Sequence, residues 1–411
     1  MLQLPNRLFY RQRRCRTLAR PSVTLVFLIL LIPVHVLGQD EPRDFDFGPS
    51  GQTSVALTDQ SIIEVTINGK GPFKVIFDTG ANVNILDPEV IAQLNLPASN
   101  FVAPVSGLSG GHLDTKPFHV SELRIGDLTL NDQEFFNIPI PLPKSYAIVG
   151  AIGYELFSRI VIKADYEHHQ LVFFDPAGFS STGSGQKLDL QPDSNSIVVK
   201  ARIDSRIGDC VLDTGALGEI ELGLDAWFVR RYHLVHPFAR HYHGVFSQGA
   251  DGSAPAATVE RIRDVCLGDA CVPRVIAALS DGNGNSPHAG RIGLSILRRF
   301  TTTIDWPHHA IYIEKAPAWD RPAVYNKTGL DTDSDDAGNV LIVTRVFPDS
   351  PAYRAHLKTG DRILLIDNHP PAPDWFWDDR AFLKPDGTRL ILSVQRGSAN
   401  LQLTLILKEI L

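Results

Sequence analysis

The stretch Val75-Ile-Phe-Asp-Thr-Gly-Ala81 occurs again as Cys210-Val-Leu-Asp-Thr-Gly-Ala216, which separates Asp78 from Asp213 by 135 residues (213 − 78). Each Asp follows two apolar residues and precedes Thr-Gly, so it is expected at the end of a buried strand, on a turn that glycine allows to bend sharply. One Asp-Thr-Gly string alone is a weak signal. Two equivalent copies indicate a duplicated unit whose pseudo-two-fold axis brings both carboxylates to one point.

A second pair of segments supports this duplication. Gly153-Tyr-Glu-Leu-Phe-Ser-Arg-Ile-Val-Ile-Lys-Ala-Asp165 corresponds to Gly293-Leu-Ser-Ile-Leu-Arg-Arg-Phe-Thr-Thr-Thr-Ile-Asp305, at an offset of 140 residues (293 − 153). The glycine and the aspartate both keep this offset. The sequence therefore predicts two pseudo-symmetric lobes, residues 50–182 and 183–316.

Short runs of β-branched and aromatic residues, broken by Gly, Asn, Asp and Pro, fill both of these segments. Examples are residues 61–67, 74–77 and 196–203. The helical candidates, residues 88–94 and 294–299, are short. We therefore expect a mainly β protein with two all-β lobes.

The composition limits the kinds of partner. The 411 residues are enough for two or three domains, each with its own core. The formal net charge of −7 is spread along the chain, and no basic block remains once the first twenty residues are set aside. We therefore expect no nucleic-acid partner.

The N-terminus has the order of a secretory signal. Six arginines within residues 1–20 precede the apolar run 23–32, and Val36 and Gly38 suit a cut before Gln39. We expect residues 1–38 to be a signal peptide and the mature protein to be secreted or periplasmic. The alternative is an uncleaved membrane anchor, although the run is short for a span and is followed by Pro33.

Two of the four cysteines are expected to form a disulfide. Cys266 and Cys271 flank Leu-Gly-Asp-Ala, and a two-residue turn at Gly268-Asp269 would place them opposite each other on a hairpin. Cys210 precedes an apolar pair, so we expect a buried, inert thiol there.

Two carboxylates held close together cannot both ionise, so they share a proton. The ionised member can then activate a water molecule, and the protonated member can hydrogen-bond a carbonyl group. Across residues 50–316 the chain resembles the pepsin and retropepsin clan of aspartic proteases, as a single-chain version of the retropepsin dimer. The resemblance implies that Asp78 and Asp213 are catalytic. It further implies that Thr79 and Thr214 clamp the pair across the lobes, and that Gly80 and Gly215 admit close backbone approach.

The chain departs from the family pattern in two ways. Arg291 replaces an apolar residue before Ile292-Gly293, which puts packing behind the second turn in question. Ala81 and Ala216 follow the turns, as in retropepsins, where pepsins have a hydroxyl that bonds the carboxylate. Losing that donor disfavours the ionised form, so we expect a pH optimum less acidic than that of a pepsin.

The resemblance also implies a hairpin flap over the substrate, for which the Gly-rich segment with Gly107, Gly110 and Gly111 is the first candidate and residues 242–249 the second. The alternative is a surface hairpin that contacts no substrate. Four histidines within residues 233–243 lack the spacing of a metal site, so we expect no metal and no cofactor. The His-His pairs at 168–169 and 308–309 indicate an inherited turn.

Residues 317–326 are expected to be a linker, and residues 327–411 resemble a PDZ domain with α+β structure. The family binds peptide C-termini by strand addition. The carboxylate loop corresponds to Thr328, Gly329 and Leu330, followed by an acidic insert at 331–336 that would repel a carboxylate. Docking of substrate, regulation and a purely structural role are the alternatives for this module.

The sequence therefore predicts an aspartic endopeptidase that acts on peptide or protein substrates as a monomer. The first alternative is a catalytically inactive peptide-binding protein that keeps the fold. The second, a membrane-anchored scaffold, requires that the N-terminal run is retained.

Overall fold

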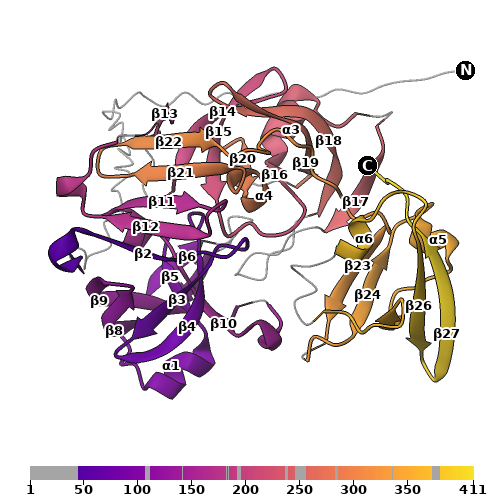
Figure 1. The fold of residues 1–411 in the computed structure, drawn as a ribbon, viewed down its shortest axis with the longest axis horizontal. Coiled ribbons are helices and arrows are strands. Elements are labelled where there is room, and N and C mark those ends of the chain that lie inside the picture. The colour runs from indigo at the N-terminus through magenta and orange to yellow at the C-terminus, as the bar shows by residue number, and fades with distance from the viewer. Residues whose placement is uncertain are drawn as a thin grey trace, which may run out of the picture. The chain divides into compact units, whose positions relative to one another are not determined.

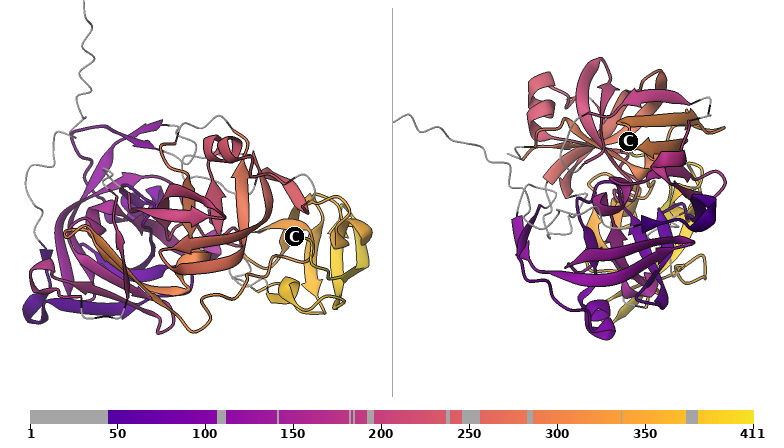
Figure 2. Two further views of the ribbon diagram at one scale, coloured as in Figure 1. Left: turned by 90° about the horizontal axis from the view of Figure 1, so that it is seen from above. Right: turned by 90° about the vertical axis from the view of Figure 1, so that its left-hand side faces the viewer.

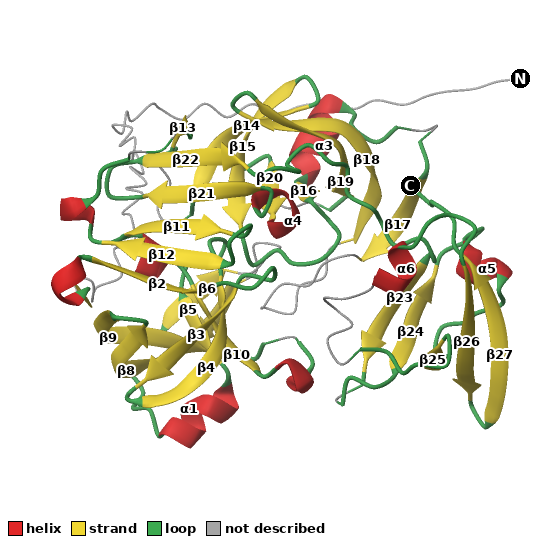
Figure 3. Ribbon diagram, in the orientation of Figure 1, coloured by secondary structure: helices red, strands yellow, loops and turns green. Residues whose placement is uncertain are grey.

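The computed structural model describes residues 45–106, 112–140, 142–181, 183, 185–191, 196–236, 239–245, 256–282, 286–335, 337–372 and 380–411. Figure 3 shows strands throughout these residues, with a few short helices. The mainly β fold predicted from the sequence is confirmed. The expected signal segment lies outside the described residues, and among those described no helix is long and apolar enough to cross a bilayer.

Six strands between residues 62 and 152 close into a first barrel. Hydrogen-bonded neighbours follow the order β9-β5-β10-β4-β3-β8, and β8 pairs with β9 to complete the ring. In β3, Ile63, Val65 and Ile67 are buried while Glu64 is exposed, as the two-residue period of a strand requires. The strands are β3 (Ile62–Ile67), β4 (Lys70–Phe77), β5 (Asn84–Leu86), β8 (Pro117–Ile125), β9 (Leu128–Asn137) and β10 (Ile148–Ile152).

Six later strands close into a second barrel with the same order. Neighbours follow β19-β16-β20-β15-β14-β18, and β18 pairs with β19. If β3 is matched to β14, β4 to β15 and so on in chain order, each pairing of the first barrel has its counterpart in the second. The strands are β14 (Val198–Ile203), β15 (Arg206–Asp213), β16 (Leu222–Leu224), β18 (Ala256–Leu267), β19 (Ala270–Ser280) and β20 (Gly290–Gly293).

A six-stranded sheet contains strands from both halves of the repeat, in the order β13-β22-β21-β11-β12-β2. Its central pair, β11 with β21, is antiparallel, and Figure 1 shows these strands side by side. The strands are β2 (Gln52–Ala56), β11 (Val161–Asp165), β12 (Gln170–Phe174), β13 (Gln186–Asp189), β21 (Phe300–Asp305) and β22 (Ala310–Lys315).

The two His-His pairs lie in equivalent hairpin turns of this sheet. Nδ1 of His168 lies 2.9 Å from Oδ2 of Asp165, and Nδ1 of His308 lies 2.8 Å from Oδ1 of Asp305. The second histidine of each pair has a positive φ, 53° and 52°. The inherited turn that the sequence indicates is therefore present in both copies.

Helix α1 (Pro88–Leu94) has the bounds expected from the sequence. Asp87 caps it by accepting a first-turn N–H at 2.8 Å, and Asn95 ends it with a φ of 51°. Helix α4 (Leu294–Leu297) begins at the expected residue and ends earlier. The described residues before the C-terminal module also contain the α-helices α2 (Tyr154–Phe157) and α3 (Ala226–Tyr232) and the short 3-10 helices η1 (Gly48–Ser50), η2 (Lys144–Tyr146) and η3 (Pro176–Gly178).

The C-terminal residues form a five-stranded antiparallel sheet in the order β23-β24-β25-β26-β27, whose strands stay grouped in both views of Figure 2. Here the structure differs from the expected acidic insert, because most of that segment is strand β23. The elements are β23 (Leu330–Ser334), β24 (Leu341–Val346), α5 (Pro351–Arg354), β25 (Arg362–Ile366), α6 (Arg380–Leu383), β26 (Arg389–Arg396) and β27 (Ala399–Ile406). The module has its own apolar core, with Leu341, Ile363 and Leu390 fully buried.

The remaining strands lie at sheet edges or form a separate pair. Strand β1 (Phe45–Asp46) pairs with β9, and β17 (His241–Val245) pairs with β18. Strands β6 (Ala103–Ser106) and β7 (His112–Thr115) pair only with each other among the residues described.

Candidate active site

The two Asp-Thr-Gly turns lie at equivalent ends of the two barrels. Asp78 follows β4, and Asp213 is the last residue of β15. A later strand runs parallel to each, β10 beside β4 and β20 beside β15. The N–H of Asp78 donates to the carbonyl of Ile152 at 2.9 Å, and the N–H of Leu294 donates to the carbonyl of Ala216 at 3.1 Å. Each turn is therefore held by the segment that carries the second repeated glycine.

Thr79 and Thr214 exchange hydrogen bonds across the two turns. The N–H of each donates to Oγ1 of the other at 3.0 Å. The Thr79 hydroxyl donates to the Leu212 carbonyl at 2.7 Å, and the Thr214 hydroxyl donates to the Phe77 carbonyl at 2.6 Å. Both threonines are buried, so every one of these bonds is shielded from water. This threonine clamp fixes the distance between the turns.

The glycines of the turns leave room for the carboxylates. A Cβ atom added to Gly80 would lie 2.3 Å from Cγ of Asp213, and one added to Gly215 would lie 2.3 Å from Cγ of Asp78. These separations are far shorter than any van der Waals contact. Each carboxylate therefore lies against the glycine of the opposite turn, and the two carboxylates meet between the turns.

Backbone donors hold both carboxylates. Oδ1 of Asp78 accepts from the N–H groups of Gly80 at 2.8 Å and Ala81 at 3.1 Å, and Oδ1 of Asp213 accepts from Ala216 at 2.8 Å. Burial, and then the negative charge of Asp213, raise the pKa of Asp78 to about 7, although the backbone donors oppose the shift. The Asp78 carboxyl group therefore keeps its proton from acid pH up to about neutrality.

Arg291 contacts the pair directly. Ile292 fills the core of the second barrel, so the strand alternation turns Arg291 to the opposite face, where its side chain is 35% exposed. Its Nη1 donates to Oδ2 of Asp213 at 3.2 Å. The sequence raises a question about packing at this position, and the structure shows an ion pair there instead.

Two supporting side chains carry no motif in the sequence. Oγ of Ser61 donates to the Phe77 carbonyl at 2.9 Å and lies 3.0 Å from the hydroxyl of Tyr166. Oδ1 of Asn84, a buried residue, accepts from the N–H of Gly153 at 3.1 Å. Ser61 supports the strand end that carries Asp78, and Asn84 holds the glycine behind the first turn.

The expected flap glycines Gly107, Gly110 and Gly111 lie outside the described residues. The paired strands β6 and β7 flank them, with Ser106 opposite His112. Of the second flap candidate, β17 covers the first part, and the residues after Val245 lie outside the description as well. Whether either segment contacts substrate remains a prediction.

The expected carboxylate loop of the C-terminal module is bonded internally. Thr328 is fully buried, and its Oγ1 accepts from the N–H of Leu330 at 3.0 Å. The N–H of Thr328 donates to Oδ1 of Asn326 at 2.9 Å. Gly329 has a φ of 71°. Two of the three amides in this loop therefore donate to side chains of the short segment 326–330.

Cys266 and Cys271 are joined by a disulfide across the β18–β19 hairpin. Cys210 is a free, buried cysteine, and burial raises the pKa of its thiol to about 12. Among the residues described, no group of three or more His, Cys, Asp or Glu side chains is placed to hold a metal ion.

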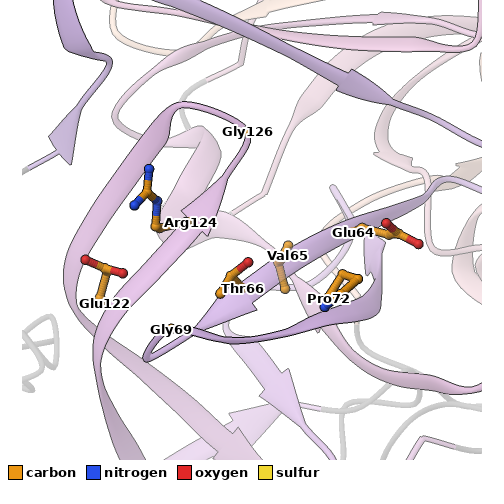
Figure 4. A pocket seen from close by; sticks show the side chains of 8 residues that line it. All are labelled: Glu64, Val65, Thr66, Gly69, Pro72, Glu122, Arg124 and Gly126. Carbon is orange, nitrogen blue, oxygen red and sulfur yellow. The ribbon is translucent and has the colours of Figure 1, made fainter.

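A surface pocket lies apart from these residues. Its volume is about 440 Å³, and Figure 4 shows Glu122 and Arg124 of β8 facing it across from β3. None of the residues that line it belongs to the Asp-Thr-Gly turns. The lining residues are Glu64, Val65, Thr66, Gly69, Pro72, Glu122, Arg124 and Gly126.

Comparison with known proteins gives one family. Residues 63–156 match the family described as aspartyl protease. This segment runs from β3 into α2 and includes the Asp78 turn and Gly153 behind it. A search of curated proteins finds no match. The chain therefore contains an aspartic protease-like domain.

Proposed function

We propose that this protein is an aspartic endopeptidase in which Asp78 and Asp213 together activate water. The observation that carries the proposal is the close approach of the two carboxylates, each lying against the glycine of the opposite turn. The threonine clamp and the raised pKa of Asp78 support it, because they keep a shared proton in a fixed place.

The reaction needs one proton on the pair. The ionised carboxylate accepts a proton from water as the water oxygen attacks the scissile carbonyl carbon, while the protonated carboxyl group hydrogen-bonds the carbonyl oxygen. The tetrahedral intermediate collapses as the C–N bond breaks and the leaving nitrogen receives a proton from the pair. One water is consumed, and the pair returns to its starting charge.

Apolar side chains near the first turn indicate the kind of peptide that would fit. Val83, Phe101 and Leu217 are partly buried and pack against a cluster that includes Ile76 and Ala151. Leu217 comes from the second turn, so this cluster involves both halves of the site. We propose that apolar residues of the substrate bind beside the scissile bond.

The alternative, an inactive peptide-binding protein, is less well supported. Burial of two carboxylates against each other costs free energy, and the raised pKa of Asp78 reflects that cost. A protein that only bound peptides would have no use for this arrangement. Both turns also keep their Thr and Gly residues.

The test is cleavage of a mixed peptide library by the mature protein at pH 3 to 8. We expect Asp78→Asn and Asp213→Asn each to lower kcat/KM by at least about a thousandfold, since either change removes the shared proton. Asp127→Asn, on an exposed turn, serves as the matched control and should cleave like the wild type. If the wild type and the three variants all leave the library uncleaved, the peptidase proposal is rejected and the peptide-binding alternative remains.

For the C-terminal module we propose a docking role on the PDZ pattern. Strand β23 lies at the edge of its sheet, where an extended peptide can add as a further strand. The internal bonds of Thr328 and Leu330 favour strand addition over capture of a terminal carboxylate. We further propose export through residues 1–38, which sequencing of the mature N-terminus tests.

A further inference from the structure

The two halves of the site differ in charge at one position. In the first barrel Ala151 of β10 lies beside Ile76 of β4, and in the second Arg291 of β20 lies beside Val211 of β15. The two positions are equivalent in register, one residue before the buried isoleucine of each strand. Ala151 is 4% exposed and uncharged, whereas Arg291 carries a cation. The pseudo-symmetry of the barrels is therefore broken next to the carboxylates.

The cation makes its direct contact with one carboxylate. Nη1 of Arg291 lies 3.2 Å from Oδ2 of Asp213, the oxygen that the Ala216 N–H does not occupy. Asp78 receives two backbone N–H groups on Oδ1 and feels the charge of Arg291 through space. A full positive charge within hydrogen-bonding distance favours an ionised partner more than a neutral N–H dipole does.

Other titratable groups face Arg291 from the elements packed around it. Asp225, between β16 and α3, is half-buried, and Arg291 acts on its carboxyl group. Burial raises the pKa of Asp225, while the hydroxyl of Ser286 and the charges of Arg291 and His288 oppose that shift. Arg291 therefore lies among three carboxyl groups, those of Asp78, Asp213 and Asp225, and its direct ion pair is with Asp213.

We propose that Arg291 is a positioning residue that keeps the negative charge of the singly ionised pair on Asp213. Asp213 is then the base that takes the proton of water, and Asp78 is the acid that hydrogen-bonds the scissile carbonyl. This assignment rests on the proposed peptidase function. In a symmetric pair either carboxyl group can hold the proton, and the ion pair removes that equivalence.

The first test is the pH dependence of kcat/KM in Arg291→Ala, which copies the residue of the first barrel. Loss of an opposite charge at this distance raises the apparent pKa of the acid limb, and we expect a shift of about one pH unit. Arg291→Lys keeps the charge and should retain most of the wild-type limb. The control variant Arg263→Ala removes an arginine of β18 whose ion pair is with Asp264 and not with Asp78 or Asp213. It should leave the acid limb of the pH profile unchanged.

The results separate a positioning role from a structural one. An acid limb that moves in Arg291→Ala and returns in Arg291→Lys supports the proposal. A lower rate at every pH, with an unmoved limb in both variants, would overturn it and make Arg291 a structural residue. If the wild type cleaves nothing, the proposed function fails, and the second test still decides where the charge lies.

The second test reads the charge without catalysis. Carboxyl ¹³C resonances of labelled aspartate are followed from pH 3 to 8, with Asp78→Asn and Asp213→Asn used to assign the two signals. We expect the Asp213 carboxyl to ionise first in the wild type, and Arg291→Ala to narrow the gap between the two apparent midpoints. Ionisation of Asp78 first, or a gap that Arg291→Ala leaves unchanged, would refute the assignment.

Discussion

Under the proposed function, the proton on Asp78 links catalysis to pH. Burial and the charge of Asp213 raise the pKa of this carboxyl to about 7, so it is neutral at acid pH and ionises as the pH rises through neutrality. Once both carboxylates are charged, no donor remains for the scissile carbonyl. We expect kcat/KM to fall about tenfold per pH unit above about pH 7. Initial rates from pH 5 to 9 measure this limb, with circular dichroism as a control for folding, and a profile flat to pH 9 would contradict it.

Gly80 tolerates no side chain at all. A Cβ there would lie 2.3 Å from Cγ of Asp213, so Gly80→Ala must push the carboxylate or the turn aside. We expect loss of cleavage by at least about a hundredfold, since misplacement by 1 Å costs that much. Gly223→Ala in β16 is the matched control, because nothing lies within 4 Å of its added Cβ. Comparable activity of the two variants would show that the close approach of the turns does not matter.

Site residues that belong to a contiguous, repeated motif can be predicted from the sequence. Asp78, Thr79 and their counterparts Asp213 and Thr214 are of this kind. Ser61 and Asn84 cannot be found that way, because each acts through a backbone group distant in sequence. Arg291 stands out as a departure from a pattern. The face from which the Arg291 side chain projects follows from its neighbour, because successive side chains of a strand point to opposite faces and Ile292 is buried.

The threonine clamp joins the two turns and can be tested through either threonine. Thr79→Val keeps the shape but removes the acceptor for the Thr214 N–H and the donor to the Leu212 carbonyl. Two buried polar groups then lose their partners, and we expect a loss of about 2 to 5 kcal/mol in the free energy of unfolding. Thr79→Ser keeps the hydroxyl and should lose much less. Urea denaturation gives both values, and equal losses would mean that packing, and not the hydroxyl, is what Thr79 supplies.

Helices and strands differ in how well the sequence predicts them. Asp87 and Pro88 mark the start of α1 by local capping chemistry, so its bounds can be predicted. Strand β23 is missed, since aspartates are poor strand formers. Its Asp331 lies opposite Arg345 of β24, and Nε of that arginine donates to the carboxylate at 2.6 Å. This cross-strand ion pair offsets the low strand propensity of the aspartate. It cannot be predicted from residues 331–336 alone, because Arg345 belongs to another strand.

The raised pKa of Asp78 also bears on the stability of the whole molecule. Between the ordinary aspartate value of 3.8 and about 7, the folded protein holds a proton that the unfolded chain has released. Stability therefore falls as the pH rises through this window. Asp78→Asn removes this dependence, so we expect the variant to exceed the wild type by a few kcal/mol at pH 8 and to match it near pH 3.

Urea denaturation of Asp78→Asn and wild type at pH 3, 5 and 8 measures the difference. Asp127→Asn again provides the control for a change of charge at an exposed turn. A stability difference that is the same at pH 3 and pH 8 would show that the proton on Asp78 is not the cause.

Over the whole molecule, the duplication predicts that two units exist and that both are β. It does not predict how each closes. The pairings of β8 with β9 and β18 with β19 complete the barrels, and β11 lies beside β21 across the repeat. These contacts join strands by geometry that no local pattern encodes, because hydrophobic alternation is satisfied by many pairings. The boundaries of the domains and the flap residues remain predictions.

The threonine clamp has a consequence for the order in which the protein is made. During synthesis the first barrel emerges well before Thr214, and the strand β20 that holds the second turn emerges later still. A nascent chain at that stage contains Asp78 without Asp213, and the backbone N–H of Thr79 lacks its acceptor. Under the proposed function, peptide hydrolysis becomes possible only once both barrels are complete. Under that proposal, the order of the two turns along the chain delays activity until translation has passed the second turn.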